Sequence, residues 1–219
     1  MNAPRAELNL WKQRLGVVPE TVWEQVGLET LILADNDLTS VSAGIGRLTA
    51  LRTLDLGHNL LADIPEALGD LGQLDRFLYL HDNRLTDLPL SLGRLRRLRY
   101  LNLSANLLPR LPEAVRGMSG LVELRVTDNR IGELPVWVGE FPHLRELHLR
   151  NNRLASLPAS LAGLRELRHL DLRGNPLIGL PAELANLPKL EKLDLRWTPS
   201  EAMPGWLPDL ESRGCLVYR

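Results

Sequence analysis

Imidazole and thiol side chains are the groups in this chain that could support acid–base catalysis, nucleophilic attack or metal binding. Four of the five histidines, His58, His81, His148 and His169, fall at positions that face outward from the strands predicted below. They lie in four different repeats, with no cysteine and no tight arrangement of carboxylates to complete a metal site. We therefore expect no metal site and no cofactor.

The remaining signals for catalysis are equally weak. Cys215 has no histidine nearby in the sequence, which argues against a cysteine nucleophile, and a single cysteine cannot form an internal disulfide. The stretch "GIGRLTALRTL" has two close glycines but lacks the third glycine of a phosphate-binding loop. We predict that the chain is not an enzyme and that it belongs to a reducing compartment.

Two columns of residues recur along the chain with one shared period. Asparagines follow one another at steps of 23 residues, with a single step of 24 between the second and the third: Asn36, Asn59, Asn83, Asn106, Asn129, Asn152 and Asn175. Prolines keep the same spacing from Pro65 to Pro181 and share the same 24-residue exception. Two columns with one period and one exception indicate a tandem repeat array.

The repeated skeleton LxxLxLxxNxLxxLPxxLxxLxx resembles the leucine-rich repeat, in the 23-residue type of intracellular Ras-suppressor-like scaffolds and of many bacterial proteins. The resemblance implies an α/β solenoid, a right-handed curved horseshoe with a parallel concave β-sheet and short helical or 3-10 turns on the convex side. Strand alternation places Leu54 and Leu56 inward and Asp55 outward. Each asparagine of the column is expected to be buried, with its amide bonded to backbone groups of adjacent turns, as a structural ladder.

Because a single repeat cannot bury its own leucines, the array is predicted to be one domain. The expected organisation is a single domain over 1–219, with an N-terminal capping repeat at 1–27, seven central repeats at 28–189, and the last repeat with a C-terminal cap at 190–219. The C-terminal cap is expected to hold a helix from Trp206 to Glu211 and a final strand, "CLVYR". Trp23 and Trp206 are expected to cover the ends of the core.

The stretch "LGQLDRFLYLHDNRLTDLP" departs from the period, because three residues separate Leu74 from Leu78 where neighbouring repeats have two. The register on both sides places the extra residue within 75–77, at the entrance to a predicted strand. Two interpretations remain open. The insertion is either tolerated without consequence, or it acts as a bulge that re-aims its neighbours and marks the working surface.

Aromatic residues fall on the same two repeats. Strand counting predicts a cluster of outward residues flanked by two arginines, and this candidate partner-binding site consists of Arg76, Phe77, Tyr79, His81, Arg99 and Tyr100. Aromatic residues with arginine are typical of the energetic centre of a protein-binding surface. The alternative is that Phe77 folds back into the core and leaves the two tyrosines as a diagonal pair.

A second candidate surface lies nearer the C-terminus. An arginine follows the strand in each of three repeats, and stacking of these like charges can be offset by Asp171 and Asp194. One interpretation is a solvated ribbon of mixed charge. The other is a patch for an acidic or phosphorylated partner segment, formed by Arg125, His148, Arg150, Arg173, Arg196 and Trp197.

Composition limits the kinds of partner. The net charge of −1 gives no global attraction to nucleic acid or to an anionic membrane, although 23 of the 26 basic residues are arginine, which indicates a GC-rich genome. No stretch approaches the length of a membrane span, and the N-terminus lacks the apolar run of a secretory signal. We expect a cytoplasmic protein, or one delivered into a host cytosol if the chain is a bacterial effector.

The resemblance implies a protein–protein interaction module that binds a protein or peptide on its concave face, in a scaffold or recognition role. One alternative is the substrate-recognition part of an enzyme system, such as a bacterial effector or an adaptor for a ligase or kinase, with catalysis elsewhere. Another is a concave face that mediates self-association. We expect a monomer that binds a protein or peptide ligand and neither nucleic acid nor a membrane.

Overall fold

The computed structural model describes residues 6–199 and 203–219, and the chain divides into two compact units. The N-terminal unit runs to Leu107 and includes Pro112–Leu121, whereas the C-terminal unit consists of Leu108–Leu111 and Val122–Arg219. Residues 1–5 and 200–202, which belong to the two predicted caps, lie outside the described residues. The organisation as one domain over 1–219 stays a prediction.

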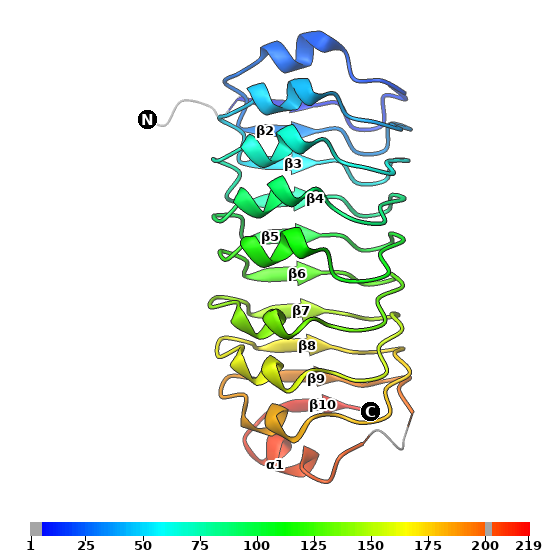
Figure 1. The fold of residues 1–219 in the computed structure, drawn as a ribbon, viewed down its shortest axis with the longest axis vertical. Coiled ribbons are helices and arrows are strands. Elements are labelled where there is room, and N and C mark those ends of the chain that lie inside the picture. The colour runs from blue at the N-terminus through cyan, green and yellow to red at the C-terminus, as the bar shows by residue number, and fades with distance from the viewer. Residues whose placement is uncertain (1–5, 200–202) are drawn as a thin grey trace. The chain divides into compact units, whose positions relative to one another are not determined.

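Each unit is built from short parallel strands that pair in chain order (Figure 1). The strands described in the N-terminal unit are β1 (Glu7–Asn9), β2 (Thr30–Ile32), β3 (Thr53–Asp55), β4 (Phe77–Tyr79) and β5 (Tyr100–Asn102). Those described in the C-terminal unit are β6 (Glu123–Arg125), β7 (Glu146–His148), β8 (His169–Asp171), β9 (Lys192–Asp194) and β10 (Leu216–Tyr218). The predicted parallel pairing of a repeat solenoid is confirmed.

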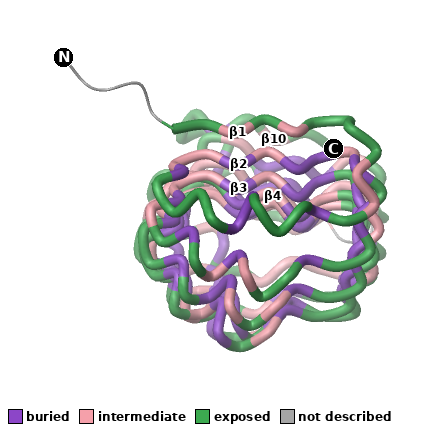
Figure 2. Tube along the Cα trace, turned by 90° about the horizontal axis from the view of Figure 1, so that it is seen from above, coloured by how far each residue is buried: buried purple, intermediate pink, exposed green. Residues whose placement is uncertain are grey.

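Strand alternation separates core from surface in both units. The middle residue of each strand from β2 to β9 is a leucine with at most 1% of its surface exposed, and Leu54 on β3 has none exposed. The first and last residues of each strand point to the other side. We call that side the open sheet face of its unit. In Figure 2, buried segments alternate with exposed ones along the trace, as this pattern requires.

A five-residue 3-10 helix returns the chain in each repeat, which confirms the predicted turns. The N-terminal unit contains η1 (Glu20–Glu24), η2 (Ala43–Arg47), η3 (Glu66–Asp70), η4 (Leu90–Arg94) and η5 (Glu113–Gly117), and the C-terminal unit contains η6 (Val136–Glu140), η7 (Ala159–Gly163) and η8 (Ala182–Asn186). Proline precedes every one except η2, and its fixed φ suits the extended entry to the turn. Ser42 takes this place before η2, and its hydroxyl accepts a hydrogen bond from the Gly44 N–H.

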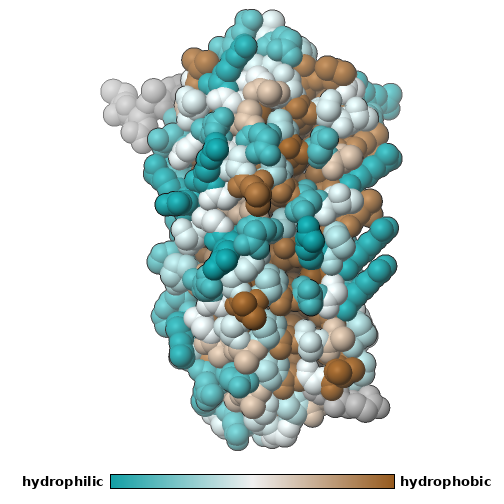
Figure 3. All heavy atoms as spheres, viewed as in Figure 1, coloured by the Kyte–Doolittle hydropathy of each residue, from teal (hydrophilic) through white to brown (hydrophobic). Residues whose placement is uncertain are grey.

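The surface around these returns carries apolar as well as polar side chains. Leu90 on η4 is 71% exposed and Val136 on η6 is 72% exposed. In the space-filling view, hydrophobic groups lie among hydrophilic side chains (Figure 3). Single exposed apolar side chains are ordinary on protein surfaces, so we assign them no role.

The seven asparagines of the repeat column are buried, with at most 8% of their surface exposed. Asn106 shows the pattern: its Nδ2 donates to the carbonyls of Leu80 and Leu103, at 2.9 and 3.0 Å, and its Oδ1 accepts from the Leu85 N–H at 2.9 Å. The amide thus satisfies backbone groups of two consecutive repeats at a point that strand pairing does not reach.

A residue in the left-handed region directly precedes every one of these asparagines. The seven residues are Asp35, His58, Asp82, Ala105, Asp128, Asn151 and Gly174, with φ between 52° and 66°. Glycine adopts this conformation without steric cost, whereas other residues incur a penalty. The turn is therefore part of the repeat and does not depend on the residue that occupies it.

Tryptophans lie near both predicted caps. Trp23 on η1 is completely buried, whereas Trp206 is half-buried and directly precedes α1 (Leu207–Ser212). The predicted C-terminal helix and final strand are therefore confirmed, with the helix beginning and ending one residue later than predicted. None of the described helices has the length and apolar character needed to span a membrane.

Candidate functional site

Three aromatic rings gather on the open sheet face of the N-terminal unit. Phe77 and Tyr79 are the first and last residues of β4, and Tyr100 begins β5 opposite Phe77. The ring centroids are 5.8 Å apart for Phe77 and Tyr79, 5.5 Å for Phe77 and Tyr100, and 5.1 Å for the two tyrosines. These separations lie within the range of about 4.5–7 Å that aromatic pairs prefer. We call the three rings the aromatic cluster.

Phe77 is the most exposed member of the cluster, with 40% of its surface accessible. The alternative in which this ring folds back into the core is therefore wrong. The core position beneath is filled by Leu78, which is completely buried, so no space is left for a second large side chain. A partner that covers this exposed ring gains binding free energy of about 25 cal/mol per Å² of apolar area removed from water.

His81 extends the aromatic cluster along the strand direction. Its ring centroid lies 5.9 Å from that of Tyr79 and 4.7 Å from that of His58. The imidazole lies against Gly57, where an added Cβ would come within 2.3 Å of the ring, so a side chain at that position would displace the imidazole. Burial lowers the pKa of His81, and the neighbouring His58 lowers it further, so the His81 imidazole is neutral at neutral pH. His58 in turn bonds through Nδ1 to Asp82 Oδ2 at 2.5 Å.

Arg76 and Arg99 directly precede β4 and β5 and flank the aromatic cluster. Arg76 is half-buried and Arg99 is exposed. Among the described residues, neither guanidinium forms an ion pair with a carboxylate. Both charges are therefore available to a partner, in contrast to Arg173 and Arg196 of the C-terminal unit.

The backbone ladder identifies the inserted residue. The Arg76 N–H donates to the Arg52 carbonyl and the Arg76 carbonyl accepts from the Tyr100 N–H, both at 3.1 Å. Arg76 thus occupies the ladder position just before the strand, and Asp75 is the extra residue. Phe77 still pairs with Thr53 in register, so the side chains of β4 keep the faces that the repeat predicts.

The arginine column of the C-terminal unit consists of Arg150, Arg173 and Arg196. Two of these arginines are held by carboxylates. Arg173 donates from Nε and Nη2 to Asp171, at 2.9 and 2.6 Å, and its Nε lies 3.5 Å from Asp194 Oδ2. Arg196 donates to Asp194 in the same two-bond manner, at 2.9 and 2.7 Å. The two aspartates are 9% and 1% exposed. The predicted offset of the stacked positive charges by these aspartates is confirmed.

The third arginine of the column, Arg150, makes a looser contact. Its Nη2 lies 3.1 Å from Asp128 Oδ2, and both side chains are more than a third accessible, at 35% and 41%. The Nε of Arg150 is buried and has no hydrogen-bond partner among the described residues. This end of the column is therefore held less tightly than the end at Arg173 and Arg196.

Trp197 and Tyr218 present rings beside these arginines. Trp197 is 71% exposed with φ at 62°, and the guanidinium carbons of Arg173 and Arg196 each lie 5.9 Å from its ring. Tyr218 on β10 is 40% exposed and lies beneath both Arg196, at 5.2 Å, and Lys192 Nζ, at 5.3 Å. Tyr218 and Lys192 were not predicted, because only the pairing of β10 with β9 brings them together.

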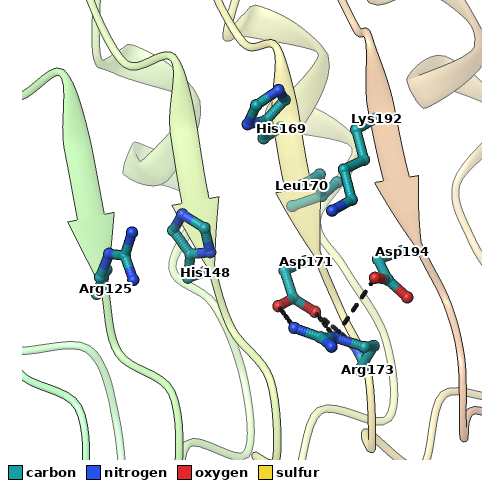
Figure 4. A pocket seen from close by; sticks show the side chains of 8 residues that line it. All are labelled: Arg125, His148, His169, Leu170, Asp171, Arg173, Lys192 and Asp194. Atoms are coloured by element: carbon teal, nitrogen blue, oxygen red, sulfur yellow. Dashed lines mark hydrogen bonds and ion pairs between the residues drawn. The ribbon is translucent and has the colours of Figure 1, made fainter. Parts of the chain in front are cut away.

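A shallow hollow of about 180 Å³ opens on the open sheet face of the C-terminal unit (Figure 4). Its walls combine basic, acidic and apolar side chains: Arg125, His148, His169, Leu170, Asp171, Arg173, Lys192 and Asp194. Arg173 points at the two aspartates in this view, so its charge is largely neutralised. The surface is therefore of mixed charge and not uniformly basic.

The structure also brings carboxylates close to a histidine, which corrects the expectation that no tight carboxylate arrangement exists. Glu123 on β6, Glu146 on β7 and His148 on β7 each offer an oxygen or nitrogen atom, and these atoms lie within 4.8 Å of one another. Arg125 donates from Nε to Glu123. Burial lowers the pKa of His148, although its hydrogen bond with Glu146 acts in the opposite direction.

Solved structures with the same fold come from several sources. A leucine-rich repeat protein of Leptospira interrogans is 25% identical with a TM-score of 0.60, and the match covers 93% of this chain and 63% of that one. The ectodomain of the receptor kinase GASSHO1/SCHENGEN3 of Arabidopsis thaliana, in complex with CASPARIAN STRIP INTEGRITY FACTOR 2, is 29% identical with a TM-score of 0.81. That match covers 97% of this chain and 26% of the receptor chain.

The leucine-rich repeat domain of the type III effector XopL shares the fold at 23% identity and a TM-score of 0.78, over 99% of this chain and 77% of that one. None of the curated proteins compared with this chain matches it. The family model for the leucine-rich repeat matches residues 26–85, 76–131 and 142–199. These matches span most of the sequence and coincide with the repeated strands, 3-10 returns and buried asparagines described above, so the chain belongs to the leucine-rich repeat family.

Proposed function

We propose that the N-terminal unit binds a protein or peptide segment on its open sheet face, the face predicted from the sequence to be concave. The observation that carries this proposal is the aromatic cluster of Phe77, Tyr79 and Tyr100, which forms one contiguous surface with an exposed ring at its edge. Large aromatic rings supply contact area at a low cost in conformational entropy, and they dominate the energetics of many interfaces.

The electrostatics around the cluster support the same role. Arg76 and Arg99 lie beside the rings without a carboxylate partner among the described residues. A guanidinium that is free in the unbound protein can form two-bond contacts with a partner carboxylate. His81 adds a neutral polar edge at the other end of the cluster. We therefore expect the bound segment to combine an apolar or aromatic anchor with an acidic residue.

The C-terminal unit contributes a second, weaker candidate surface. The residues predicted there are Arg125, His148, Arg150, Arg173, Arg196 and Trp197. Internal ion pairs satisfy Arg173 and Arg196, so an acidic partner would have to compete with buried aspartates. Trp197 is the better candidate contact in this unit, because its ring is exposed and supported by two guanidinium groups.

The plant receptor ectodomain described above forms a complex with CASPARIAN STRIP INTEGRITY FACTOR 2, which supports a recognition role for this repeat architecture. This chain spans only 26% of that receptor chain, so the receptor's partner is not assigned to it. The proposed role, a scaffold or recognition module, needs no catalytic step from this chain. A substrate-recognition role beside a separate enzyme would use the same surface. The identity of the bound partner distinguishes that role from a scaffold role.

Selection from a displayed peptide library tests the proposal directly. Wild-type protein is expected to enrich peptides with an aromatic or apolar anchor near an acidic residue, and calorimetry with the enriched peptide gives its affinity. The Tyr79→Ala/Tyr100→Ala variant removes two of the three rings and is expected to lose this binding. It is expected to fold as wild type does, because both side chains lie on the surface and not in the core.

A matched control changes the return segment of the same repeat. Leu90→Ala/Arg94→Ala removes an exposed apolar group and an exposed charge from η4, away from the open sheet face. This variant is expected to bind as wild type does. Equal binding by all three folded proteins would show that the aromatic cluster is not the contact surface.

A further inference from the structure

A group of metal-ligating side chains lies on the open sheet face of the C-terminal unit, independent of the proposed peptide site. The repeat period places Glu123 and Glu146 at the same outward position of β6 and β7, and His148 follows two residues after Glu146 on the same face. His169 occupies the equivalent position to Glu146 on β8. The side chains of Glu123, Glu146 and His148 are 21%, 33% and 19% exposed, so the group is partly shielded from solvent.

The separations of the donor atoms suit one small divalent ion. His148 Nε2 lies 3.1 Å from Glu146 Oε2 and 3.8 Å from Glu123 Oε1, and His169 Nδ1 lies 3.7 Å from Glu146 Oε2. Ligands bound tetrahedrally to Zn²⁺ at about 2.0–2.2 Å lie about 3.3–3.6 Å apart. The two distances from His148 straddle this value, and the donor atoms of Glu123, Glu146 and His148 all lie within 4.8 Å of one another, whereas His169 lies outside this group.

We propose that Glu123, Glu146 and His148 bind a divalent transition-metal ion of the Zn²⁺ class. An imidazole with two carboxylates forms a donor set that suits zinc, cobalt and nickel better than magnesium or calcium, which prefer oxygen ligands alone. The imidazole distinguishes the group from an ordinary cluster of surface carboxylates. The ion would link two adjacent strands, since its ligands come from β6 and β7.

A neighbouring cation affects the affinity of the group. Arg125 donates from Nε to Glu123, so it neutralises the carboxylate and competes with the metal ion. The site is therefore predicted to bind metal with an affinity that Arg125 limits.

Metal titration of the full chain tests the proposal. Metal-free protein is titrated with Zn²⁺ by calorimetry and with Co²⁺ by visible absorption, because Co²⁺ in a tetrahedral site absorbs strongly. One ion per chain is expected to bind. His148→Gln and Glu146→Gln are each expected to weaken binding by more than about tenfold, the lower end of what changes in outer-shell groups alone cause. His143→Gln, an exposed histidine outside the group, is the matched control and is expected to bind as wild type does.

A fourth variant keeps the test decisive if a ligand variant fails to fold. Arg125→Gln removes the competing cation and leaves all three ligands in place, so it is expected to bind Zn²⁺ more tightly than wild type. Absence of stoichiometric binding, equal losses in His148→Gln and His143→Gln, or unchanged affinity in Arg125→Gln would each overturn the proposal.

Discussion

Arg52 holds the carboxylate of the inserted residue Asp75 with two hydrogen bonds, from Nε to Oδ1 at 2.9 Å and from Nη2 to Oδ2 at 2.6 Å. Arg97, in the following repeat, places its Nη2 3.6 Å from the same carboxylate. The extra residue of the 24-residue repeat is therefore fixed by cations from both neighbours, and its side chain is only 15% exposed. The insertion has a structural role of its own, separate from the aromatic cluster that follows it.

This relationship predicts a pH-dependent effect of Asp75→Asn. The hydrogen bonds from Arg52 lower the pKa of the Asp75 carboxyl, and burial opposes this only in part. A lowered pKa in the folded state stabilises the fold above the unfolded value, about 3.9, and this contribution is lost as the pH falls through the folded value. We expect Asp75→Asn to reduce the free energy of unfolding by about 1 kcal/mol at neutral pH, since Arg52 is partly exposed.

Urea unfolding at neutral pH and at about pH 2.5, below the unfolded pKa, measures this difference. The difference in stability between the two proteins is expected to be smaller at the lower pH. Asp70→Asn, which breaks the exposed pair with Arg94, is the control and is expected to change stability little at either pH. A difference between wild type and Asp75→Asn that is the same at both pH values would contradict the role of the ionised carboxylate.

The asparagine column predicts a large effect of Asn106→Ala. The substitution leaves the buried Leu85 N–H without its acceptor, and the buried Leu80 carbonyl keeps only the Asn83 Nδ2 donor at 3.2 Å. Leaving buried polar groups unsatisfied costs about 1–3 kcal/mol. Asn186→Ala at the exposed end of η8 is the control, with little change expected. A melting temperature of Asn106→Ala equal to that of wild type would show that the amide does not support the fold.

The left-handed turn before each asparagine predicts the cost of a methyl group at Gly174. Gly174 has φ at 66°, and an added Cβ would lie 2.3 Å from Asn151 Oδ1. We expect Gly174→Ala to lower the free energy of unfolding by about 1–2 kcal/mol, the penalty for a side chain in this region. Gly179→Ala, five residues on, has open space and an ordinary φ, so it is expected to be neutral or slightly stabilising. Denaturant unfolding of both variants checks the contrast.

The fold was predictable because several independent columns of the sequence require the same period. Leucines at alternating positions demand strands, the asparagine column demands a buried turn, and the proline column demands a return segment. The structure places Leu54 in the core and Asn106 in the turn for these reasons. The bounds of the C-terminal helix were predictable only to within one residue, because the ends of a helix depend on local capping that the repeat period does not determine.

The candidate sites were predictable only in part. Counting along strands placed Phe77, Tyr79 and Tyr100 on one face, but whether Phe77 turned inward depended on packing that the sequence does not specify. The same counting puts Glu123 and Glu146 in one outward column, so their proximity was accessible from the sequence. Their distances to histidine were not, because these depend on the rotamers of long side chains.

The inserted residue shows a similar limit. Register arguments narrowed it to three positions, 75–77, and only the backbone hydrogen bonds of Arg76 identified Asp75. Tyr218 was missed for another reason: it lies beyond the last asparagine of the column, where the period no longer predicts which strand is its neighbour. Its place beside Arg196 follows from the pairing of β10 with β9.

The arginine column predicts two different outcomes for two equivalent substitutions. Arg173→Gln removes a cation that contacts both Asp171 and Asp194, and Asp194 is only 1% exposed. Breaking a buried ion pair from one side costs about 3–5 kcal/mol, and since Arg196 still contacts Asp194, we expect a loss nearer the lower end. Arg150→Gln breaks an exposed contact with Asp128 and is expected to cost at most about 1 kcal/mol.

Urea unfolding of the two variants separates a structural column from a recognition surface. A large loss of stability for Arg173→Gln with a small loss for Arg150→Gln would mean that Arg173 stabilises buried carboxylates. Arg173 would then be poorly suited to bind an acidic partner. Equal and small losses would mean that the aspartates are satisfied without Arg173. In that case the guanidinium would be free to bind a partner, and the acidic or phosphorylated segment predicted from the sequence would become the favoured ligand of the C-terminal unit.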